Sequence, residues 1–381
     1  MFLKEYSVWA EVDLSALVHN LGEVRRLVGR DTEVAAVVKA NAYGHGMVEV
    51  ARALLAHGAD RLCVARVEEG VALREAGMDA PVLVMGFVPP ALYDTALDHH
   101  LTLTVFDPET AAGLSAAAGR HGRTAPVHLK LDTGMGRLGL VTADRDLYRH
   151  ILTIASLPHL EIKGLYTHFA NADRRDKAHA RRQLVDFVEV TCTLGHDGID
   201  IELLHAANSA ALIDMPESRL NLVRPGIMLY GLYPSPEVET RRVDLRPVMT
   251  LKAQVGSVKR VPAGWTVSYG STYTTPAPTT LATVPCGYAD GYNRHLSNRG
   301  AVLIHGRRAP VVGRVTMDQV VVDVGHIPDV AAGDEVVLFG RQGKAELHVD
   351  ELAALLGTIN YEVVCAVSAR VPRVYVRNEI T

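Results

Sequence analysis

The sequence has few cysteines, and those it has lie far apart. Only four occur in 381 residues, at Cys63, Cys192, Cys286 and Cys365, and no two of them form a CxxC pair. Disulfide frameworks and thiolate zinc sites both depend on cysteines at short, regular spacings. The pattern therefore argues against both kinds of site, predicts no metal centre, and fits a reducing cytoplasm.

Long apolar runs and a strong net charge are also missing. No stretch approaches the roughly 20 apolar residues of a membrane span, and Lys4 and Glu5 stand where a signal peptide would be apolar. The 39 Lys and Arg residues against 43 Asp and Glu give a formal net charge of −4, with no long basic run. We therefore expect a soluble cytoplasmic protein that has neither a membrane nor a nucleic acid as its partner.

The composition is that of a globular protein of more than one domain. Hydrophobic residues make up 48% of the chain and charged residues 22%, as in ordinary folded proteins. The length is sufficient for two domains on ordinary size grounds.

Short apolar runs alternate with longer amphipathic ones from about residue 13 to residue 230. Asp13 can cap a helix, because Leu14, Leu17, Leu21 and Val24 follow it at helical spacing. Eight apolar runs, most of them roughly 20 to 40 residues apart, are candidate strands: 33–40, 61–67, 81–87, 101–107, 126–132, 161–169, 201–207 and 221–227.

Alternating apolar strands and helices predict parallel pairing and an α/β fold. Eight such units in about 220 residues fit a (β/α)8 barrel of the TIM type, with a doubly wound open sheet as the alternative. We place this domain at 12–240.

The last third of the chain has a different pattern. Short β-rich runs such as 248–261 are separated by Gly, Pro and Asp turns, and only 349–358 has a clear helical pattern. We therefore expect a mainly β C-terminal domain at 241–381, joined by an N-terminal strand within 1–11. The polar, proline-containing segment 233–247 is the expected connection.

Polar residues with catalytic potential follow the ends of the predicted barrel strands, where barrel enzymes carry their active sites. Each one alone has an ordinary structural explanation, such as a rim lysine, a hydrogen-bonded core histidine or half of an ion pair. Their gathering at one predicted rim favours a functional site made of Lys39, Lys130, Arg137, His168, His205, Asn208, Ser209 and Arg224.

Lys39 stands out because it ends an apolar strand. An apolar setting disfavours the charged ammonium and lowers a lysine's pKa, which provides the free amine that Schiff-base chemistry needs. Its partner would be a carbonyl substrate or the aldehyde of pyridoxal 5′-phosphate. The cofactor would also need a phosphate site, which the Ser209 hydroxyl and the backbone N–H groups of Gly226 and Ile227 can supply after the last two strands.

Nine motifs together resemble the alanine racemase family. In order they are VVKANAYGHG, HLKLDTGMGRLG, THFANAD, HAANSA, VRPGIMLYG, SYGSTY, GYADGY, VGRVTMDQ and TINYE, and they run from residue 37 to residue 362. Each is weak alone, but the ordered set is specific. The resemblance implies a pyridoxal-phosphate-dependent isomerase with a barrel and a C-terminal β domain, active as a homodimer.

The resemblance also implies roles for individual residues. Lys39 would be the Schiff-base lysine and one catalytic base, and Tyr269 from the partner subunit would be the other. Arg137 would approach the substrate carboxylate, and Lys130 is the position that carries a carbamate in many members of the family. The remaining cofactor residues would be Tyr43, His168, Asn208, Ser209, Arg224, Gly226, Ile227 and Tyr361, and the substrate pocket would contain Tyr288, Met317 and Asp318.

The chemistry of racemisation fits two opposed bases, because a proton leaves one face of the substrate and returns to the other. Tyrosine is a poor base, with an ordinary pKa near ~10, so a positive environment from His168 and Arg224 is expected around Tyr269. Arg224 can only donate to the cofactor's ring nitrogen. That nitrogen would stay unprotonated, which weakens electron withdrawal and limits side reactions.

Alanine is the expected substrate, with D-alanine for cell-wall precursors as the usual family role. Tyr269, Tyr288, Tyr361 and Met317 would narrow the entrance to small amino acids. A broad-specificity amino-acid racemase is the nearest alternative. A non-catalytic cofactor carrier and a decarboxylase of the same barrel class are the more distant ones.

Overall fold

The structure is a computed structural model that describes residues 5–377. Its contacts divide the chain into two units. The unit that we call the barrel unit contains Leu17–Ala42 and Met47–Arg246. The C-terminal unit contains the residues from Pro247 onward, Tyr43–Gly46 and the N-terminal segment up to Ala16.

The barrel unit contains eight parallel strands in the order β10-β2-β3-β4-β5-β6-β8-β9, and each predicted run supplies one of them. The backbone N–H of Arg224, just after β10, donates to the Ala207 carbonyl just after β9 at 3.0 Å, so the two ends of the sheet meet. The fold is a nearly closed (β/α)8 barrel, as predicted. The strands are β2 (Glu33–Val37), β3 (Arg61–Val64), β4 (Val82–Val84), β5 (Thr102–Val105), β6 (Ala125–Asp132), β8 (Leu160–Tyr166), β9 (Leu203–His205) and β10 (Leu222–Val223), with β7 (Leu140–Val141) paired to β6.

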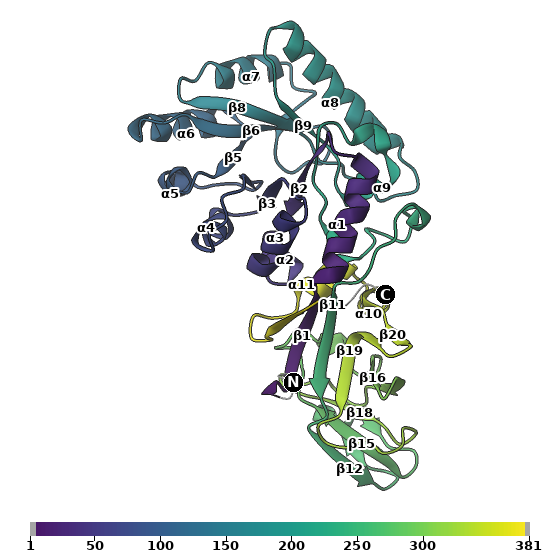
Figure 1. The fold of residues 1–381 in the computed structure, drawn as a ribbon. Coiled ribbons are helices and arrows are strands. Elements are labelled where there is room, and N and C mark those ends of the chain that lie inside the picture. Colours follow the sequence, from purple (N-terminus) through teal and green to yellow (C-terminus); the bar gives the residue numbers. More distant parts are fainter. Residues whose placement is uncertain (1–4, 378–381) are drawn as a thin grey trace. The chain divides into compact units, whose positions relative to one another are not determined.

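Helices follow most of the barrel strands and lie outside them (Figure 1). The first begins directly after Asp13, whose carboxylate accepts the N–H groups of Ser15 and Ala16 at 2.8 and 3.1 Å, which confirms the predicted cap. The helices are α1 (Leu14–Val28), α3 (Met47–Ala56), α4 (Val67–Glu75), α5 (Tyr93–Asp98), α6 (Pro108–Arg120), α7 (Leu147–Ala155), α8 (Ala178–His196) and α9 (Ser209–Asp214).

The interior of the barrel is apolar toward its strand starts and polar toward one part of its rim. Val34, Leu62 and Val82 are fully buried, and β-branched and leucine side chains of this kind fill barrel cores. The same core also encloses His128, Lys130, His205 and Arg224. Four ionisable side chains inside a barrel need partners or a function, because burying charge without either is costly.

The C-terminal unit is mainly β, as predicted. Its largest sheet has the order β17-β16-β19-β11-β1-β21, with β20 paired to β19, and β1 joins antiparallel to β11 and parallel to β21. A second sheet has the order β12-β15-β18, and β13 pairs with β14. The strands are β1 (Val8–Asp13), β11 (Met249–Gln254), β12 (Ser257–Val261), β13 (Thr266–Val267), β14 (Tyr273–Thr274), β15 (Thr279–Val284), β16 (Ala301–Ile304), β17 (Arg307–Pro310), β18 (Val320–Asp323), β19 (Glu335–Gln342), β20 (Ala345–Leu347) and β21 (Arg373–Val376).

Among its described residues from Pro247 onward this unit has two α-helices, of which the sequence predicted one. The predicted helix is α10 (Val349–Leu356), and it ends at Gly357 in a left-handed conformation. The second, α11 (Asn360–Cys365), has six residues, too few for a hydrophobic period to be recognised. The sequence therefore predicted the first helix and did not reveal the second.

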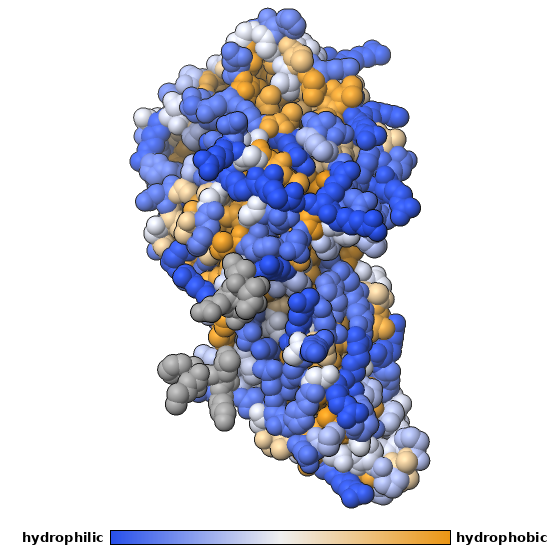
Figure 2. Space-filling model, turned by 45° about the vertical axis from the view of Figure 1, so that its right-hand side comes forward, coloured by the Kyte–Doolittle hydropathy of each residue, from blue (hydrophilic) through white to orange (hydrophobic). Residues whose placement is uncertain are grey.

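Polar residues cover most of the face drawn in Figure 2, and apolar residues show between them. None of the helices in the described part of the chain has the length and apolarity that crossing a membrane requires.

The end of β2 is tied to the segment after β10 by two hydrogen bonds. Val37 donates its N–H to the Pro225 carbonyl at 3.0 Å, and the buried Tyr230 hydroxyl donates to the Val37 carbonyl at 2.8 Å. Tyr230 closes a short 3-10 turn, η4 (Ile227–Tyr230). These bonds hold the strand end that precedes Lys39 against the segment that follows Arg224.

We expect Tyr230→Phe to lower the free energy of unfolding by about 1–2 kcal/mol, because it leaves a buried carbonyl without its donor. Tyr148→Phe is the matched control, since the half-buried Tyr148 hydroxyl makes no hydrogen bond with the described residues. Urea unfolding of the two variants measures the difference. Equal stabilities would show that the bond contributes nothing.

Candidate active site

The segment after β2 is a short turn of left-handed helix. Ala40, Asn41 and Ala42 have φ between 53° and 54° and ψ between 45° and 52°, in the element labelled α2 (Lys39–Tyr43). Tyr43 follows with φ 52°. Each L-residue in this conformation costs roughly 1–2 kcal/mol, so the surrounding structure must hold it.

Hydrogen bonds from both sides hold the turn. The N–H of Ala40 donates to the Glu69 carboxylate on α4 at 2.6 Å, and the Asn41 side-chain oxygen accepts the N–H of Met47 at 2.8 Å. Ala42 donates its N–H to the Val38 carbonyl at 2.8 Å. The backbone that carries the half-buried Lys39 is thus strained and fixed at once.

Asp132 organises the loop that carries Arg137. One carboxylate oxygen accepts the N–H groups of Gly134, Met135 and Gly136, and the other accepts that of Arg137, at 2.8 to 3.1 Å. Burial raises the pKa of Asp132, but the four N–H donors outweigh it and the net shift is downward. The side chain of Arg137 is exposed and makes no hydrogen bond or ion pair with the described residues, so it is available to an anion.

Lys130 is buried near the end of β6 and forms no ion pair with a carboxylate of residues 5–377. Its ammonium donates to the Leu138 carbonyl at 2.9 Å and lies 5.4 Å from the centre of the Tyr166 ring. Burial, followed by the charges of Arg224 and Arg137, lowers the pKa of Lys130 to about 8. A lysine with a lowered pKa has more of its neutral amine near pH 7, and the neutral amine is the nucleophilic form.

Arg224 is a buried guanidinium surrounded by neutral acceptors. Nη2 donates to the Thr167 and Ala206 carbonyls at 2.8 and 3.2 Å, and Nη1 donates to Nδ1 of His205 at 2.6 Å. These bonds use three of the five N–H groups of a guanidinium. Two N–H groups, including the one on Nε, therefore have no partner among the described residues.

His168 is half-buried after β8 and stays neutral near neutral pH. Burial, followed by the charges of Arg224 and Arg137, places the pKa of His168 well below its ordinary value. The positive charge that the sequence led us to expect in this region therefore belongs to the guanidinium groups and not to the imidazole.

The loops after β9 and β10 meet at Ser209. Its hydroxyl oxygen accepts the N–H groups of Gly226 and Met228 at 2.9 and 3.3 Å, which leaves the hydroxyl proton to donate. Asn208 caps α9 through the N–H of Ala211 at 3.0 Å. Ile227 begins a 3-10 turn, so its N–H has no acceptor within that turn. These residues lie together, and their donors suit a phosphate group.

The remaining candidates lie in the C-terminal unit. The rings of Tyr43 and Tyr361 have centres 6.1 Å apart, which brings together two residues 318 positions apart in the chain. Tyr361 stands near the start of α11, the helix that the sequence did not predict.

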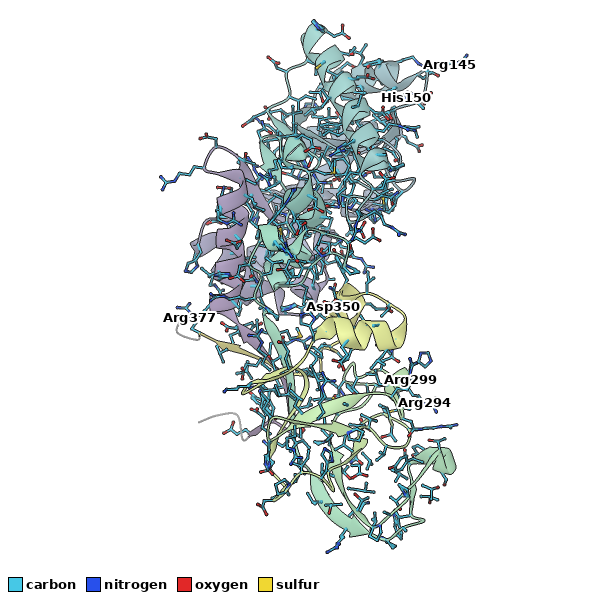
Figure 3. All side chains as sticks on the ribbon, turned by 90° about the vertical axis from the view of Figure 1, so that its right-hand side faces the viewer. Arg145, His150, Arg294, Arg299, Asp350 and Arg377 are labelled. Atoms are coloured by element: carbon cyan, nitrogen blue, oxygen red, sulfur yellow. The ribbon has the colours of Figure 1, made fainter. Side chains whose placement is uncertain are left out.

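The segment with Met317 and Asp318 runs beside Tyr288. Tyr288 donates its N–H to the Thr316 carbonyl and Ala289 donates to the Met317 carbonyl, both at 3.0 Å. Arg370 bridges Asp318, at 2.8 Å, to the buried Asp290, at 2.7 Å. Exposed arginines that follow Tyr288, among them Arg294 and Arg299, extend from this unit (Figure 3).

Tyr269 lies in a 3-10 turn, η6 (Tyr269–Ser271), and is 73% exposed. Ser268 precedes it with φ 62°, and its hydroxyl donates to the Arg314 carbonyl at 2.7 Å. Gly270 follows with φ 69°. The turn is thus fixed while the phenol projects into solvent.

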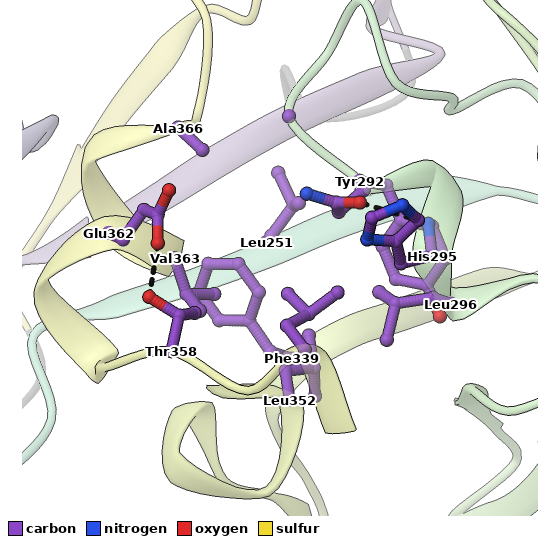
Figure 4. Close-up of a pocket in the computed structure, with 13 residues that line it drawn as sticks. Leu251, Tyr292, His295, Leu296, Phe339, Leu352, Thr358, Glu362, Val363 and Ala366 are labelled. Carbon is purple, nitrogen blue, oxygen red and sulfur yellow. Dashed lines mark hydrogen bonds between the residues drawn. The ribbon is translucent and has the colours of Figure 1, made fainter. Parts of the chain in front are cut away.

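A separate cavity of about 260 Å³ lies within the C-terminal unit, between α10, α11 and the strands β11 and β19. Its walls include Phe339, Leu352 and His295, and Glu362 is hydrogen-bonded to Thr358 at one side (Figure 4). None of the predicted site residues lines it. Within residues 5–377, no group of three or more His, Cys, Asp or Glu side chains is placed to hold a metal.

Two residues that contact candidate site residues were not singled out from the sequence: Asp132, which holds the Arg137 loop, and His128, whose Nδ1 lies 2.7 Å from Nε2 of His205. Asp132 stands within the KLDTGMGR motif, and an Asp followed by two glycines is a recognisable loop signal. His128 stands in the middle of a predicted strand and carries no local signal of a role.

Residues 12–234 match the family model for the N-terminal domain of alanine racemase, and residues 248–375 match that for its C-terminal domain. An alanine racemase from Desulforamulus reducens is 52% identical over 369 residues, which are 97% of this chain and 99% of that protein.

Solved structures give the same result. An alanine racemase from Clostridium difficile is 41% identical with a TM-score of 0.94, and the match covers 98% of this chain and 96% of that one. The enzyme from Bartonella henselae, solved with covalently bound pyridoxal phosphate, is 29% identical with a TM-score of 0.86, covering 97% of this chain and 100% of that one.

The left-handed turn predicts an unusual effect of glycine. Ala40→Gly relieves roughly 1–2 kcal/mol of backbone strain in the folded state. It also makes the unfolded chain more flexible, which raises the entropic cost of folding by roughly 0.5–1 kcal/mol. We therefore expect a net stabilisation of about 0.5–1 kcal/mol. Ala116→Gly, at an exposed position in α6, should destabilise by a similar amount. Thermal unfolding of both proteins tests the opposite signs. A loss of stability in both variants would contradict the strain argument.

Proposed function

The chain belongs to the alanine racemase family and interconverts L-alanine and D-alanine, and from this premise we propose that Lys39 and Tyr269 are its two catalytic bases. Racemisation requires proton transfer at both faces of the α-carbon. Lys39 is fixed by the strained turn after β2, and Tyr269 is carried on a turn fixed by Ser268 and Gly270. Both groups have the rigid backbone that positions a base.

Pyridoxal 5′-phosphate is the cofactor that we propose for this chain. When bound, it withdraws electrons from the substrate's α-carbon and so makes the α-proton acidic. The residues present fit it in two respects. Arg224 has two buried N–H groups without an acceptor in the described part of the chain, and Ser209, Gly226 and Ile227 offer donors for a phosphate. Asn208 would support this loop, and Tyr43 and Tyr361 would complete the phosphate contacts.

Arg224 would donate one of its free N–H groups to the ring nitrogen of the cofactor. His168 would lie by the cofactor ring as a neutral imidazole, since the pKa of His168 is far below its usual range. A donor in front of the ring nitrogen leaves no place for a proton on it. Electron withdrawal would then be moderate, which suits a reaction that returns the proton to the same carbon.

The exposure of Tyr269 is the observation that most supports a homodimer. A base that is 73% exposed in one chain cannot act in a site that excludes water. Tyr288 and Met317 are 42% and 53% exposed, and Ile359 is 58% exposed, all on the same unit. We propose that a second copy of the chain covers these residues and receives Tyr269, Met317 and Asp318 into its site.

Arg137 is the proposed contact for the carboxylate of alanine. Its loop is held by Asp132, and its guanidinium has no partner among the described residues. Tyr288 would stand at the entrance, and Met317 and Asp318 would limit the space beside the substrate's methyl group.

Lys130 is the proposed site of a carbamate. A lysine with a pKa of about 8 is neutral in roughly a tenth of molecules at pH 7, and only the neutral amine attacks CO2. The product carries a negative charge among Arg137 and Arg224, which are two of the causes of the low pKa. The modification would exchange a repulsive contact for an attractive one.

We further propose that residues 12–240 act as the cofactor-binding domain and that the enzyme works in the cytoplasm. D-alanine made there would be available for cell-wall precursors.

Mixing two inactive variants tests the shared site. Lys39→Ala and Tyr269→Phe should each fail to convert L-alanine to D-alanine. After the two are dissociated and reassociated together, half of the dimers are mixed, and each mixed dimer has one intact site. We expect about a quarter of wild-type activity. No recovery, with mixed dimers demonstrated by mass spectrometry, would mean that Tyr269 acts within its own chain.

Exposure to ¹³C-labelled bicarbonate tests the carbamate. We expect one ¹³C NMR carbamate signal that grows as the pH rises through about 8, because the neutral fraction of Lys130 increases. Lys130→Gln should remove the signal, and Lys259→Gln, at an exposed position, should retain it. A signal that survives Lys130→Gln would belong to another lysine.

A further inference from the structure

Behind Arg224, two buried histidines form a hydrogen-bonded chain that crosses the barrel interior. Arg224 bonds through Nη1 to Nδ1 of His205 at 2.6 Å, and Nε2 of His205 lies 2.7 Å from Nδ1 of His128. His205 also stacks on Tyr166, with ring centres 4.6 Å apart and an interplanar angle of 7°. The Tyr166 hydroxyl is hydrogen-bonded in turn to Thr104 at 2.9 Å.

The chain can carry its protons in one direction only. A guanidinium has donors and no acceptor, so Nδ1 of His205 must be the acceptor. A neutral His205 then has its proton on Nε2 and donates it to Nδ1 of His128. His128 must in turn have its own proton on Nε2. Each of the two tautomers is therefore fixed by the donor-only group at the head of the chain.

Both histidines are neutral, as this arrangement requires. Burial, followed by the charges of Arg61 and Arg224, lowers the pKa of His128 to about 3. Burial, followed by the charge of Arg224, places the pKa of His205 well below its ordinary range. A second proton on either imidazole would place an N–H group on Nδ1, where it would face another N–H donor of the hydrogen-bonded series.

The neighbouring strand makes room for His128. The pairing of β6 with β8 shifts by one residue between Val127 and His128, so that His128 lies opposite Gly164. Bulges of this kind redirect side chains. A Cβ on Gly164 would lie 2.5 Å from Nδ1 of His128, the atom that accepts from His205. The shifted register and the absence of a side chain at Gly164 together leave room for the imidazole of His128. A larger residue at position 164 would displace it.

We propose that His128 is a positioning residue of the racemase, which acts through His205 to fix the orientation of the Arg224 guanidinium. The inference rests on the proposed role of Arg224 toward the cofactor. His205 is one of three anchors of the guanidinium, beside the Thr167 and Ala206 carbonyls. Without an acceptor at position 128, the buried Nε2–H of His205 loses its partner, and the tautomer that accepts from Arg224 is no longer favoured.

The tautomers are tested on the protein as purified, by ¹⁵N NMR with labelled histidine. We expect both His205 and His128 to carry their proton on Nε2, with unprotonated Nδ1 atoms. The spectra of His128→Asn and His205→Asn identify the two sets of signals. A proton on Nδ1 of His205 would overturn the proposal, and this outcome does not depend on whether the protein racemises alanine.

The functional test compares two substitutions at one position. His128→Asn retains an acceptor near the place of Nδ1, whereas His128→Leu retains size without an acceptor. We expect kcat of His128→Leu to fall roughly tenfold with KM within about a factor of two, and His128→Asn to stay within about threefold of the wild-type kcat. Equal losses of kcat in both variants, in proportion to their losses of Tm, would indicate a merely structural role and refute the proposal.

Gly164→Ala provides an independent route if His128→Leu does not fold. It should lower kcat as His128→Leu does, because the added methyl group displaces the imidazole. Gly195→Ala, in α8, is the matched control, since a Cβ there meets no atom within 4 Å. Unchanged kcat in Gly164→Ala, with both histidine tautomers retained, would contradict the positioning role.

Discussion

The site is built around a buried positive charge that has no negative partner. Arg224 is almost entirely enclosed, and among the described residues it forms no ion pair. Placing a charge in a protein interior costs several kcal/mol unless hydrogen bonds compensate. Here two carbonyls and one imidazole provide that compensation. Burial lowers the pKa of Arg224, but a guanidinium remains charged throughout the working range of an enzyme.

This constraint accounts for the state of the surrounding groups. His168, His205 and His128 are neutral because each has a lowered pKa from burial and from nearby cations. Lys130 has a lowered pKa for the same reasons. The rim therefore combines neutral imidazoles with charged or chargeable Lys39, Lys130, Arg137 and Arg224. Such a rim attracts anions, and a phosphorylated cofactor, an amino-acid carboxylate and a carbamate are each anionic.

The eight strands could be predicted because the strands of a parallel barrel are uniformly apolar. The same pattern located the polar residues that follow the strands, whose catalytic roles stay predictions. Other features depend on tertiary contacts that a single sequence does not display. The left-handed turn at Ala40–Ala42 exists because Glu69 and Asn41 hold it, and no propensity of alanine predicts that conformation. His128 became recognisable only when the shifted register of β6 and β8 placed it beside His205. The helix α11 was missed because six residues do not establish a helical period.

The protonation state of the ring nitrogen of the proposed cofactor tests the proposed role of Arg224 most directly. Protein reconstituted with pyridoxal 5′-phosphate labelled with ¹⁵N at the ring nitrogen can be measured by NMR across the working pH range. A donor-only guanidinium predicts an unprotonated, hydrogen-bonded nitrogen at every pH at which the protein is folded. A protonated pyridinium nitrogen near neutral pH would contradict the account.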